Sequence, residues 1–226
     1  MAGVISAVVP VIRKHHKLHQ WYVEPFGNLG CYPMRIYTHR LINYENKYLY
    51  FTRKRLQEGW IPPEFVHPYR AIEIRKNPNS FPEEIVGWVN HYLPIYAKMF
   101  HQVRNTDPNK LFPSFAHKLI CMQYPKYKSV QVYNLPYQKI DIPDESLIFC
   151  DMREEFMRHN YVVPDDEFWA WCRTKATQKH TVLVKSKSAP EDFTQVAAIP
   201  ITAIYAQGNP KNYKKRDMLN IYTVNA

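Results

Sequence analysis

Apolar residues at helical spacing predict a first amphipathic helix between residues 37 and 59. They recur at intervals of four, three, four and three positions, which places their side chains on one face of an α-helix. Gly59 follows the stripe, at a place where a helix commonly ends. The stripe consists of Tyr37, Leu41, Tyr44, Tyr48 and Phe51.

A second helix is predicted from a start signal as well as from its stripe. Ser80 and Glu83 have the spacing of a capping box, and Pro82 falls in what would be the first turn. Apolar residues at helical spacing continue as far as Val103. Pro94 lies inside this stretch, so we expect it to kink or split the helix.

Two further helices are predicted in the acidic middle of the chain. Asp144 is a candidate N-cap for a helix over residues 145–159, and Asp165 is a candidate N-cap for a helix over residues 166–177. Acids follow each of these caps, where the positive end of the helix dipole favours negative charge. Both segments are therefore expected to be helical.

Short segments rich in β-branched and aromatic residues predict strands in the second half of the chain. A Gly-Asn-Pro turn at residues 208–210 precedes the last of them. The predicted strands cover residues 129–133, 181–185, 197–205 and 219–224.

The order of these elements predicts an α+β fold. N-terminal amphipathic helices lead, a small and mainly antiparallel sheet follows, and eighteen Pro residues indicate extended connections and terminal arms. No repeat or Gly/Ser-rich linker marks a domain boundary. We therefore expect an apolar and basic N-terminal arm over residues 1–20, and a single compact domain over residues 21–226 with a basic C-terminal loop.

Composition excludes several classes of protein. Of the 226 residues, 46% are hydrophobic, which is enough for a folded core. The six Gly residues form neither a GxxxxGK nor a GxGxxG pattern, so P-loop and Rossmann nucleotide sites are excluded. The four Cys residues are widely spaced and form no CxxC pair, which favours reduced thiols over a disulfide scaffold.

Metal binding is disfavoured by spacing. Structural zinc ligands come in closely spaced pairs, and the best combination in this chain lacks such pairs, so we expect no metal and no cofactor. That combination is Cys150, His159, Cys172 and His180.

The N-terminal segment joins an apolar run to a basic one. Residues 2–12 are apolar and residues 13–19 are rich in basic side chains, the reverse of a secretory signal, and the apolar run is too short to span a bilayer. No acid precedes Glu24, as is typical of organellar targeting segments. An apolar arm packed on a neighbouring surface explains the same residues equally well. From this composition we expect a mitochondrial location.

Lys and Arg outnumber Asp and Glu by 30 to 20, which gives a formal net charge of +10. The excess is not uniform. Residues 1–60 carry nine basic and three acidic side chains, whereas residues 141–167 carry two basic and nine acidic ones. This distribution favours contact with nucleic acid or anionic lipid at the ends of the chain and with protein at its middle.

Basic and aromatic residues alternate between residues 32 and 55. Lys and Arg neutralise phosphates and aromatic rings stack on unpaired bases, so this composition predicts contact with RNA. Arg40, Lys47 and Lys54 are seven apart and would share one helix face. The competing interpretation is that the Tyr stripe is core and that the charges form an ordinary solvated face. With the basic N-terminal turn and a cluster near residue 213, the predicted RNA-contacting residues are Arg13, Lys14, Lys17, Arg35, Arg40, Lys47, Arg53, Lys54, Arg55, Tyr213, Lys214, Lys215 and Arg216.

Acidic residues are the candidates for protein contact. Adjacent carboxylates on a helix point in different directions, so they do not make the paired acid and base of a catalytic site. No nucleophile motif is present either. The predicted docking face consists of Glu154, Glu155, Asp165 and Asp166.

These observations predict a protein that is not an enzyme. We expect a structural subunit of a large organellar ribonucleoprotein, in the first place the mitochondrial ribosome, that contacts rRNA and neighbouring proteins. The alternative is an accessory subunit of a mitochondrial inner-membrane complex, such as the respiratory chain or ATP synthase, with peripheral membrane contact through residues 1–20. A small enzyme whose site assembles from residues distant in sequence is a third alternative.

Overall fold

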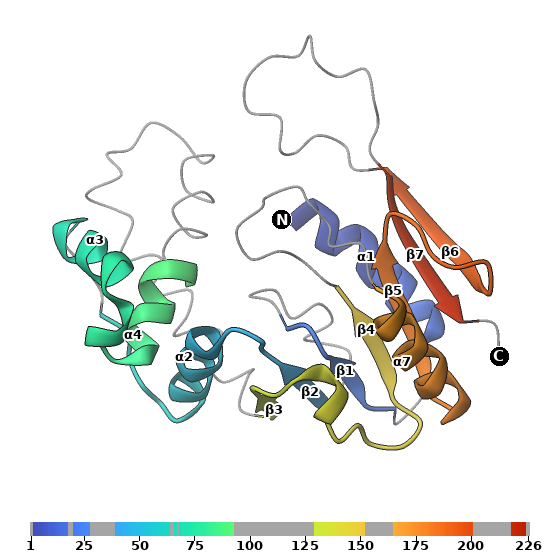
Figure 1. The fold of residues 1–226 in the computed structure, drawn as a ribbon, viewed down its shortest axis with the longest axis horizontal. Coiled ribbons are helices and arrows are strands. Elements are labelled where there is room, and N and C mark those ends of the chain that lie inside the picture. Colours follow the sequence, from blue (N-terminus) through green and yellow to red (C-terminus); the bar gives the residue numbers. More distant parts are fainter. Residues whose placement is uncertain are drawn as a thin grey trace, which may run out of the picture. The chain divides into compact units, whose positions relative to one another are not determined.

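The computed structural model describes residues 2–17, 20–27, 39–63, 66, 68–92, 129–151, 165–200 and 218–224 (Figure 1). Over these residues it contains five α-helices and seven β-strands. Parallel and antiparallel strand pairs both occur. The fold class is therefore mixed α/β.

The chain divides into two compact units. Unit 1 consists of Met1–Asn43 and Pro136–Ala226, and unit 2 consists of Tyr44–Leu135. Unit 2 is thus inserted in the sequence of unit 1. The boundaries carry no Gly/Ser-rich linker, so the composition gives no signal for this division.

The sheet of unit 1 is parallel on one side and antiparallel on the other. Its strand order is β2-β1-β4-β5-β7-β6. The first four strands pair in parallel, and β7 pairs antiparallel with both β5 and β6. The strands are β1 (Tyr22–Glu24), β2 (Arg40–Asn43), β4 (Leu147–Cys150), β5 (Thr181–Ser186), β6 (Phe193–Pro200) and β7 (Met218–Val224). The prediction of a small, mainly antiparallel sheet is wrong, because it missed the parallel half.

Strand β4 lies where the sequence predicts a helix over residues 145–159. All four of its residues are buried, because a parallel strand is covered on both faces. Such a strand is apolar throughout and shows no alternation, so periodicity does not separate it from a buried helix. Asp144 lies in a turn before β4 rather than at a helix start, so its predicted capping role is wrong. Residues 152–164 lie outside the described part of the chain.

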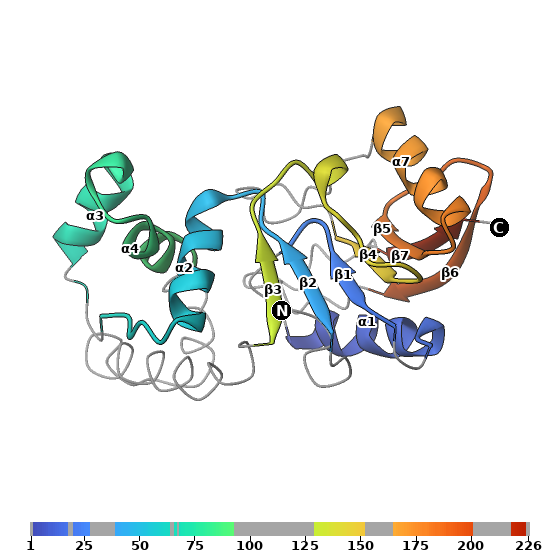
Figure 2. The same cartoon turned by 90° about the horizontal axis from the view of Figure 1, so that it is seen from below.

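Helices α1 (Ala2–His15) and α7 (Asp166–Thr177) cover opposite faces of this sheet (Figure 2). Val8 and Ile12 of α1 are fully buried. They form one core cluster with Tyr22, Leu147, Phe149, Leu183 and Ile221 of the strands. Much of the segment predicted as an arm over residues 1–20 is therefore a helix packed on the sheet.

The start of α7 agrees with the sequence. The side chain of Asp165 accepts a hydrogen bond from the backbone N–H of Phe168 at 2.9 Å. The helix ends at Thr177, where the pattern predicts its end. An N-cap is a local signal, and here it is confirmed.

Unit 2 contains α2 (Lys47–Gln57), α3 (Pro68–Lys76), α4 (Glu83–Gly87) and β3 (Val130–Tyr133). Helix α2 begins after Asn46, whose side chain accepts hydrogen bonds from the backbone N–H groups of Tyr48 at 2.8 Å and Leu49 at 3.1 Å. The predicted segment is helical only from Lys47 to Gln57. The prediction is wrong at Leu41, which is buried in β2, and Tyr37 lies outside the described residues.

The capping box predicted for the second helix is wrong. Pro82 occupies the N-cap position of α4, and no side chain caps the helix. The helix continues as a π-helical turn from Trp88 to Tyr92, and Pro94 and Val103 lie outside the described residues. The predicted segment is therefore helical from Glu83 to Tyr92, and it begins later than the N-cap predicted at Ser80 would place it.

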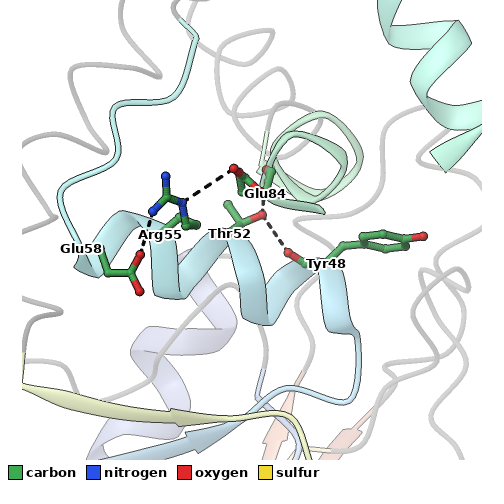
Figure 3. A network of polar contacts seen from close by, with 5 residues as sticks. All are labelled: Tyr48, Thr52, Arg55, Glu58 and Glu84. Atoms are coloured by element: carbon green, nitrogen blue, oxygen red, sulfur yellow. Dashed lines mark hydrogen bonds and ion pairs between the residues drawn. The ribbon is translucent and has the colours of Figure 1, made fainter. Parts of the chain in front are cut away.

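Helices α2 and α4 approach each other closely at Gly87. The Thr52 hydroxyl lies 2.8 Å from the carbonyl oxygen of Tyr48 and 3.0 Å from that of Glu84, so it links the two helices (Figure 3). A Cβ atom at position 87 would lie 2.1 Å from Thr52 Oγ1 and 2.3 Å from the Tyr48 carbonyl oxygen. Only glycine fits this contact.

The predicted strands near residues 129–133, 181–185 and 219–224 are confirmed as β3, β5 and β7. The strand predicted from residue 197 begins earlier, at Phe193. Phe193 is buried and packs against the ring of Trp169 on α7, with centroids 4.7 Å apart. Residues 201–217, with the predicted turn, lie outside the described residues.

Candidate functional site

Three charged side chains gather at the carboxyl ends of neighbouring parallel strands in unit 1. Glu24 is the last residue of β1, Asp151 directly follows β4, and Lys185 is the fifth residue of β5. The strand register pairs Cys150 with Val184, so Asp151 and Lys185 are level with each other. We call Glu24, Asp151 and Lys185 the strand-end cluster.

All three side chains lie on the face of the sheet that α1 covers. Side chains alternate along a strand, and Tyr22, Phe149 and Leu183 pack in the same core cluster as α1. Glu24, Asp151 and Lys185 each stand two residues further along, so they share that face.

All three side chains of the strand-end cluster are buried. Lys185 Nζ forms an ion pair with Asp151 Oδ1, and the two side chains are 0% and 3% exposed. The Tyr22 hydroxyl donates a hydrogen bond to Glu24 Oε1 at 2.8 Å, and Glu24 is buried. Buried charges are costly unless they are paired and hydrogen-bonded, and these contacts meet part of that requirement.

Burial has a direct effect on the lysine. It lowers the pKa of Lys185 to about 7, and the negative charge of Glu24 opposes that shift. The ammonium is therefore near its titration point at neutral pH. Groups shifted in this way by burial and a charged neighbour are common at functional sites, and they also occur in structural ion pairs.

The topology of the sheet also favours a functional site at the strand-end cluster. From β1 the chain adds β2 on one side of the sheet and β4 on the other, so the order reverses between β1 and β4. Open α/β sheets bind ligands outside the carboxyl ends of their strands at such a switch point. Glu24 and Asp151 stand at the carboxyl ends of these two strands. An amine and two carboxylates there have the chemistry for proton transfer or for holding a polar ligand.

Sequence reasoning missed the strand-end cluster because its members are far apart in the chain. Only the pairing of β1, β4 and β5 brings them together. A weak signal exists in the sequence, since each charge stands at the end of a short apolar run: YVE, LIFCD and TVLVK.

On the opposite face of the sheet two thiols meet. Cys150 of β4 and Cys172 of α7 are both buried and free. Burial, and then the contact with Cys172, raises the pKa of the Cys150 thiol. The pair therefore behaves as core rather than as a reactive thiolate.

The zinc combination weighed above is not assembled by the described residues. His180 Nδ1 accepts a hydrogen bond from the backbone N–H of Ser146 at 3.1 Å. Burial lowers the pKa of His180, as does the nearby positive charge of Lys175. Among the residues that the structure describes, no group of three or more His, Cys, Asp or Glu side chains could hold a metal ion, and His159 lies outside them.

The predicted RNA-contacting residues fall into several classes. Arg13 and Lys14 in the last turn of α1, and Lys17 after it, are exposed. On α2, Lys47 and Arg55 are exposed but paired. Lys47 Nζ lies 3.6 Å from Glu83 Oε1, and Arg55 contacts Glu58 at 2.9 Å and Glu84 at 3.7 Å (Figure 3). Lys54 is exposed, with its Nζ 5.8 Å from the centre of the Tyr50 ring.

Of the predicted residues that the structure describes, Arg40 and Arg53 are buried. Arg53 Nε donates a hydrogen bond to the Tyr44 hydroxyl at 3.0 Å, and its guanidinium lies about 6 Å from the ring centres of Tyr44 and Tyr92. Arg40 belongs to β2, so the prediction that it shares a helix face with the lysines of α2 is wrong. Arg35, Tyr213, Lys214, Lys215 and Arg216 lie outside the described residues.

The predicted acidic docking face is only partly described. Asp165 and Asp166 are exposed at the start of α7, where the first caps the helix and the second lies in its first turn. These positions already have a structural explanation in the helix dipole. Glu154 and Glu155 lie outside the described residues.

The apolar side of α1 is occupied by the sheet. Val8 and Ile12, which would have to enter a membrane if the segment were an anchor, are fully buried in the core. Across the described ranges, every helix is too short or too polar to cross a bilayer.

Comparison with protein-family models and with curated proteins finds no match to this chain. Its function is therefore inferred from its own residues and their geometry.

Proposed function

We propose that the protein is a non-catalytic structural subunit of a large organellar ribonucleoprotein, the mitochondrial ribosome in the first place, in contact with rRNA and neighbouring proteins. The observation that carries this proposal is the basic end of α1, which consists of Arg13, Lys14 and Lys17. All three are exposed, and none has an ion-pair partner among the described residues. Because α1 is anchored by Val8 and Ile12, Arg13 and Lys14 are presented from a fixed element, and Lys17 follows two residues after its end.

The charge of unit 2 supports the same function. Tyr44–Leu135 carries thirteen Lys and Arg against seven Asp and Glu. Its exposed cations include Lys54, Arg75 and Lys76. A basic excess of this kind attracts polyanions and makes their binding dependent on salt.

A mitochondrial location belongs to this proposal and rests on the absence of acids before Glu24.

A salt titration of RNA binding tests the proposal. The full chain and an Arg13→Ala, Lys14→Ala, Lys17→Ala variant are compared for binding to structured rRNA fragments at rising salt. The variant should reduce the slope of log affinity against log salt by about two to three, because each lost phosphate contact removes roughly 0.7 to 0.9. A Lys139→Ala, Lys175→Ala, Lys187→Ala variant loses the same charge elsewhere in unit 1 and should keep the slope. No binding by the full chain at low salt would contradict the proposal.

The strand-end cluster supports a second candidate function, a ligand-binding or acid–base site at the carboxyl edge of the sheet. The supporting observation is the buried Lys185–Asp151 pair beside Glu24 at the switch point of the sheet. Reductive methylation of the folded protein near pH 8 tests access. Rapid modification of Lys185 would support a site open to ligands. Protection of Lys185 until the protein is unfolded would support a structural ion pair.

A further inference from the structure

Helix α3 of unit 2 presents most of its surface to solvent. Of its side chains that the structure describes, Ile74 is the buried one. Ile74 is therefore the side chain that α3 contributes to the core of unit 2. Several of its other side chains, among them Tyr69 and Ile72, are exposed.

An aromatic ring, an aliphatic side chain and a cation share the face opposite Ile74. Tyr69, Ile72 and Lys76 are spaced three and four apart, which places them on one helix face. Tyr69 is the most exposed large hydrophobic side chain in the described part of the chain, at 79%. Arg75 is exposed one position before Lys76.

The charge of α3 is positive. Its acid, Glu73, accepts a hydrogen bond from Arg70 Nη1 at 2.7 Å, so that negative charge has a partner within the helix. The guanidinium of Arg70 also lies 4.5 Å from the centre of the Phe81 ring, which fixes it to the body of unit 2. Arg75 and Lys76, in the last turn, form no ion pair with the described residues.

A single-stranded polyanion fits this surface better than another protein does. An exposed ring is a stacking platform for any base, and cations about two turns further along the helix can neutralise phosphates of the same strand, whereas a purely apolar partner would leave Arg75 and Lys76 unpaired. We propose that an unpaired base of RNA stacks on Tyr69 while Arg75 and Lys76 contact phosphates further along the strand. This inference rests on the proposed ribonucleoprotein function and names one of its contact surfaces.

The test uses the full chain and a fluorescein-labelled oligouridine of about a dozen nucleotides, followed by fluorescence anisotropy. Tyr69→Ala should weaken binding by about tenfold, because one base loses its stacking partner. Tyr69→Phe keeps the ring and should bind like the unchanged protein. Ile61→Ala, at another exposed apolar residue of unit 2, should also leave affinity unchanged. Arg75→Ala with Lys76→Ala should lower the salt slope by about one to two.

The outcomes separate this inference from the proposed function. If Tyr69→Ala binds the oligouridine as tightly as the unchanged protein, while loss of Arg13, Lys14 and Lys17 weakens rRNA binding, the stacking surface is disproved and the ribonucleoprotein function stands. If Tyr69→Ala fails to assemble with a protein partner but binds RNA normally, α3 is a protein-docking face and the inference is overturned. If the unchanged protein binds neither RNA, both are overturned. Thermal unfolding of every variant is compared with that of the unchanged protein, and matching midpoints show that the variants are folded.

Discussion

Lys185 and Asp151 form an ion pair inside unit 1, with side chains 0% and 3% exposed. Strand register alone brings them together, since Cys150 stands beside Val184 on neighbouring parallel strands. The pair lies on the face of the sheet that α1 covers, together with the buried Glu24. A second ion pair of the same unit, Arg173 with Asp192, is 42% and 47% exposed and provides a natural comparison.

Asp151→Asn should destabilise unit 1 by roughly 3–5 kcal/mol, because it removes the carboxylate that is ion-paired with the buried Lys185 ammonium. Asp192→Asn removes an equivalent charge from a solvated pair and should cost less than about 1 kcal/mol. Urea denaturation of both variants at pH 7 measures the difference. If both variants lose the same small amount of unfolding free energy, the Lys185–Asp151 ion pair does not stabilise unit 1.

The stability of unit 1 should increase between pH 7 and pH 8.5. The pKa of Lys185 is about 7 in the folded protein and near 10.5 in the unfolded chain, so over this window the folded protein loses the proton while the unfolded chain keeps it. The gain is at most about 1.4 kcal/mol per pH unit. Denaturation at both pH values checks it, and Lys185→Gln should remove the dependence. A flat profile for the unchanged protein would mean that Asp151 keeps the ammonium charged throughout.

Unit 2 should lose stability on acidification below pH 6.5. Burial lowers the pKa of His91, in the π-helical turn after α4, to about 4. Between pH 6.5 and 4 the unfolded chain therefore binds a proton that the folded unit does not, and stability falls by roughly 2 kcal/mol after allowance for partial exposure. Hydrogen exchange of residues 83–92 at both pH values measures this. His91→Gln should remove that contribution, while His39→Gln, at an exposed histidine, should not.

Gly87→Ala should separate α2 from α4. The new methyl group would lie 2.1 Å from Thr52 Oγ1 and 2.3 Å from the Tyr48 carbonyl oxygen, and overpacking of this kind costs about 1–3 kcal/mol or more. Thr52→Ala should not rescue the variant, because the Tyr48 carbonyl oxygen remains in place. Thermal unfolding of Gly87→Ala, alone and with Thr52→Ala, tests both statements. Full rescue by Thr52→Ala would contradict the backbone contact.

Asp165→Ala should cost about 1 kcal/mol, because the backbone N–H of Phe168 loses its acceptor at the start of α7. Asp144→Ala is the matched control, since Asp144 lies in a turn before β4 and caps no helix. Its effect should stay within about 0.5 kcal/mol, as for most surface substitutions. Guanidinium denaturation of the two variants gives the comparison.

Local signals account for the elements that the sequence predicts well. Asp165 caps α7 by accepting a hydrogen bond from Phe168, only three residues later in the chain. The β-branched residues of β5 predict a strand from local composition alone. The helix predicted after Asp144 is wrong because Leu147–Cys150 is apolar without alternation. That pattern is shared by a strand covered on both faces and by a buried helix, so only the neighbours of the segment decide between them.

The candidate site was predicted less well than the elements. Basic residues at the end of α1 are exposed, as an RNA-contacting role requires, but Arg53 is a core residue whose guanidinium lies about 6 Å from the ring centres of Tyr44 and Tyr92. A sequence shows that Arg and Tyr alternate, and it does not show which side of the helix faces the core. Tyr69 stands in a short helix with a weak apolar pattern, so its exposure became visible only in the folded chain.

The sequence by itself determined the charge of the protein, the absence of P-loop and Rossmann patterns, the start of α7 and the presence of several strands, because each depends on residues near one another in the chain. The tertiary structure decided the parallel half of the sheet, the burial of α1 and the meeting of Glu24, Asp151 and Lys185. Those features depend on pairing between segments separated by many residues. The free energy of burying charge or apolar surface is fixed only once the neighbours from distant segments are in place.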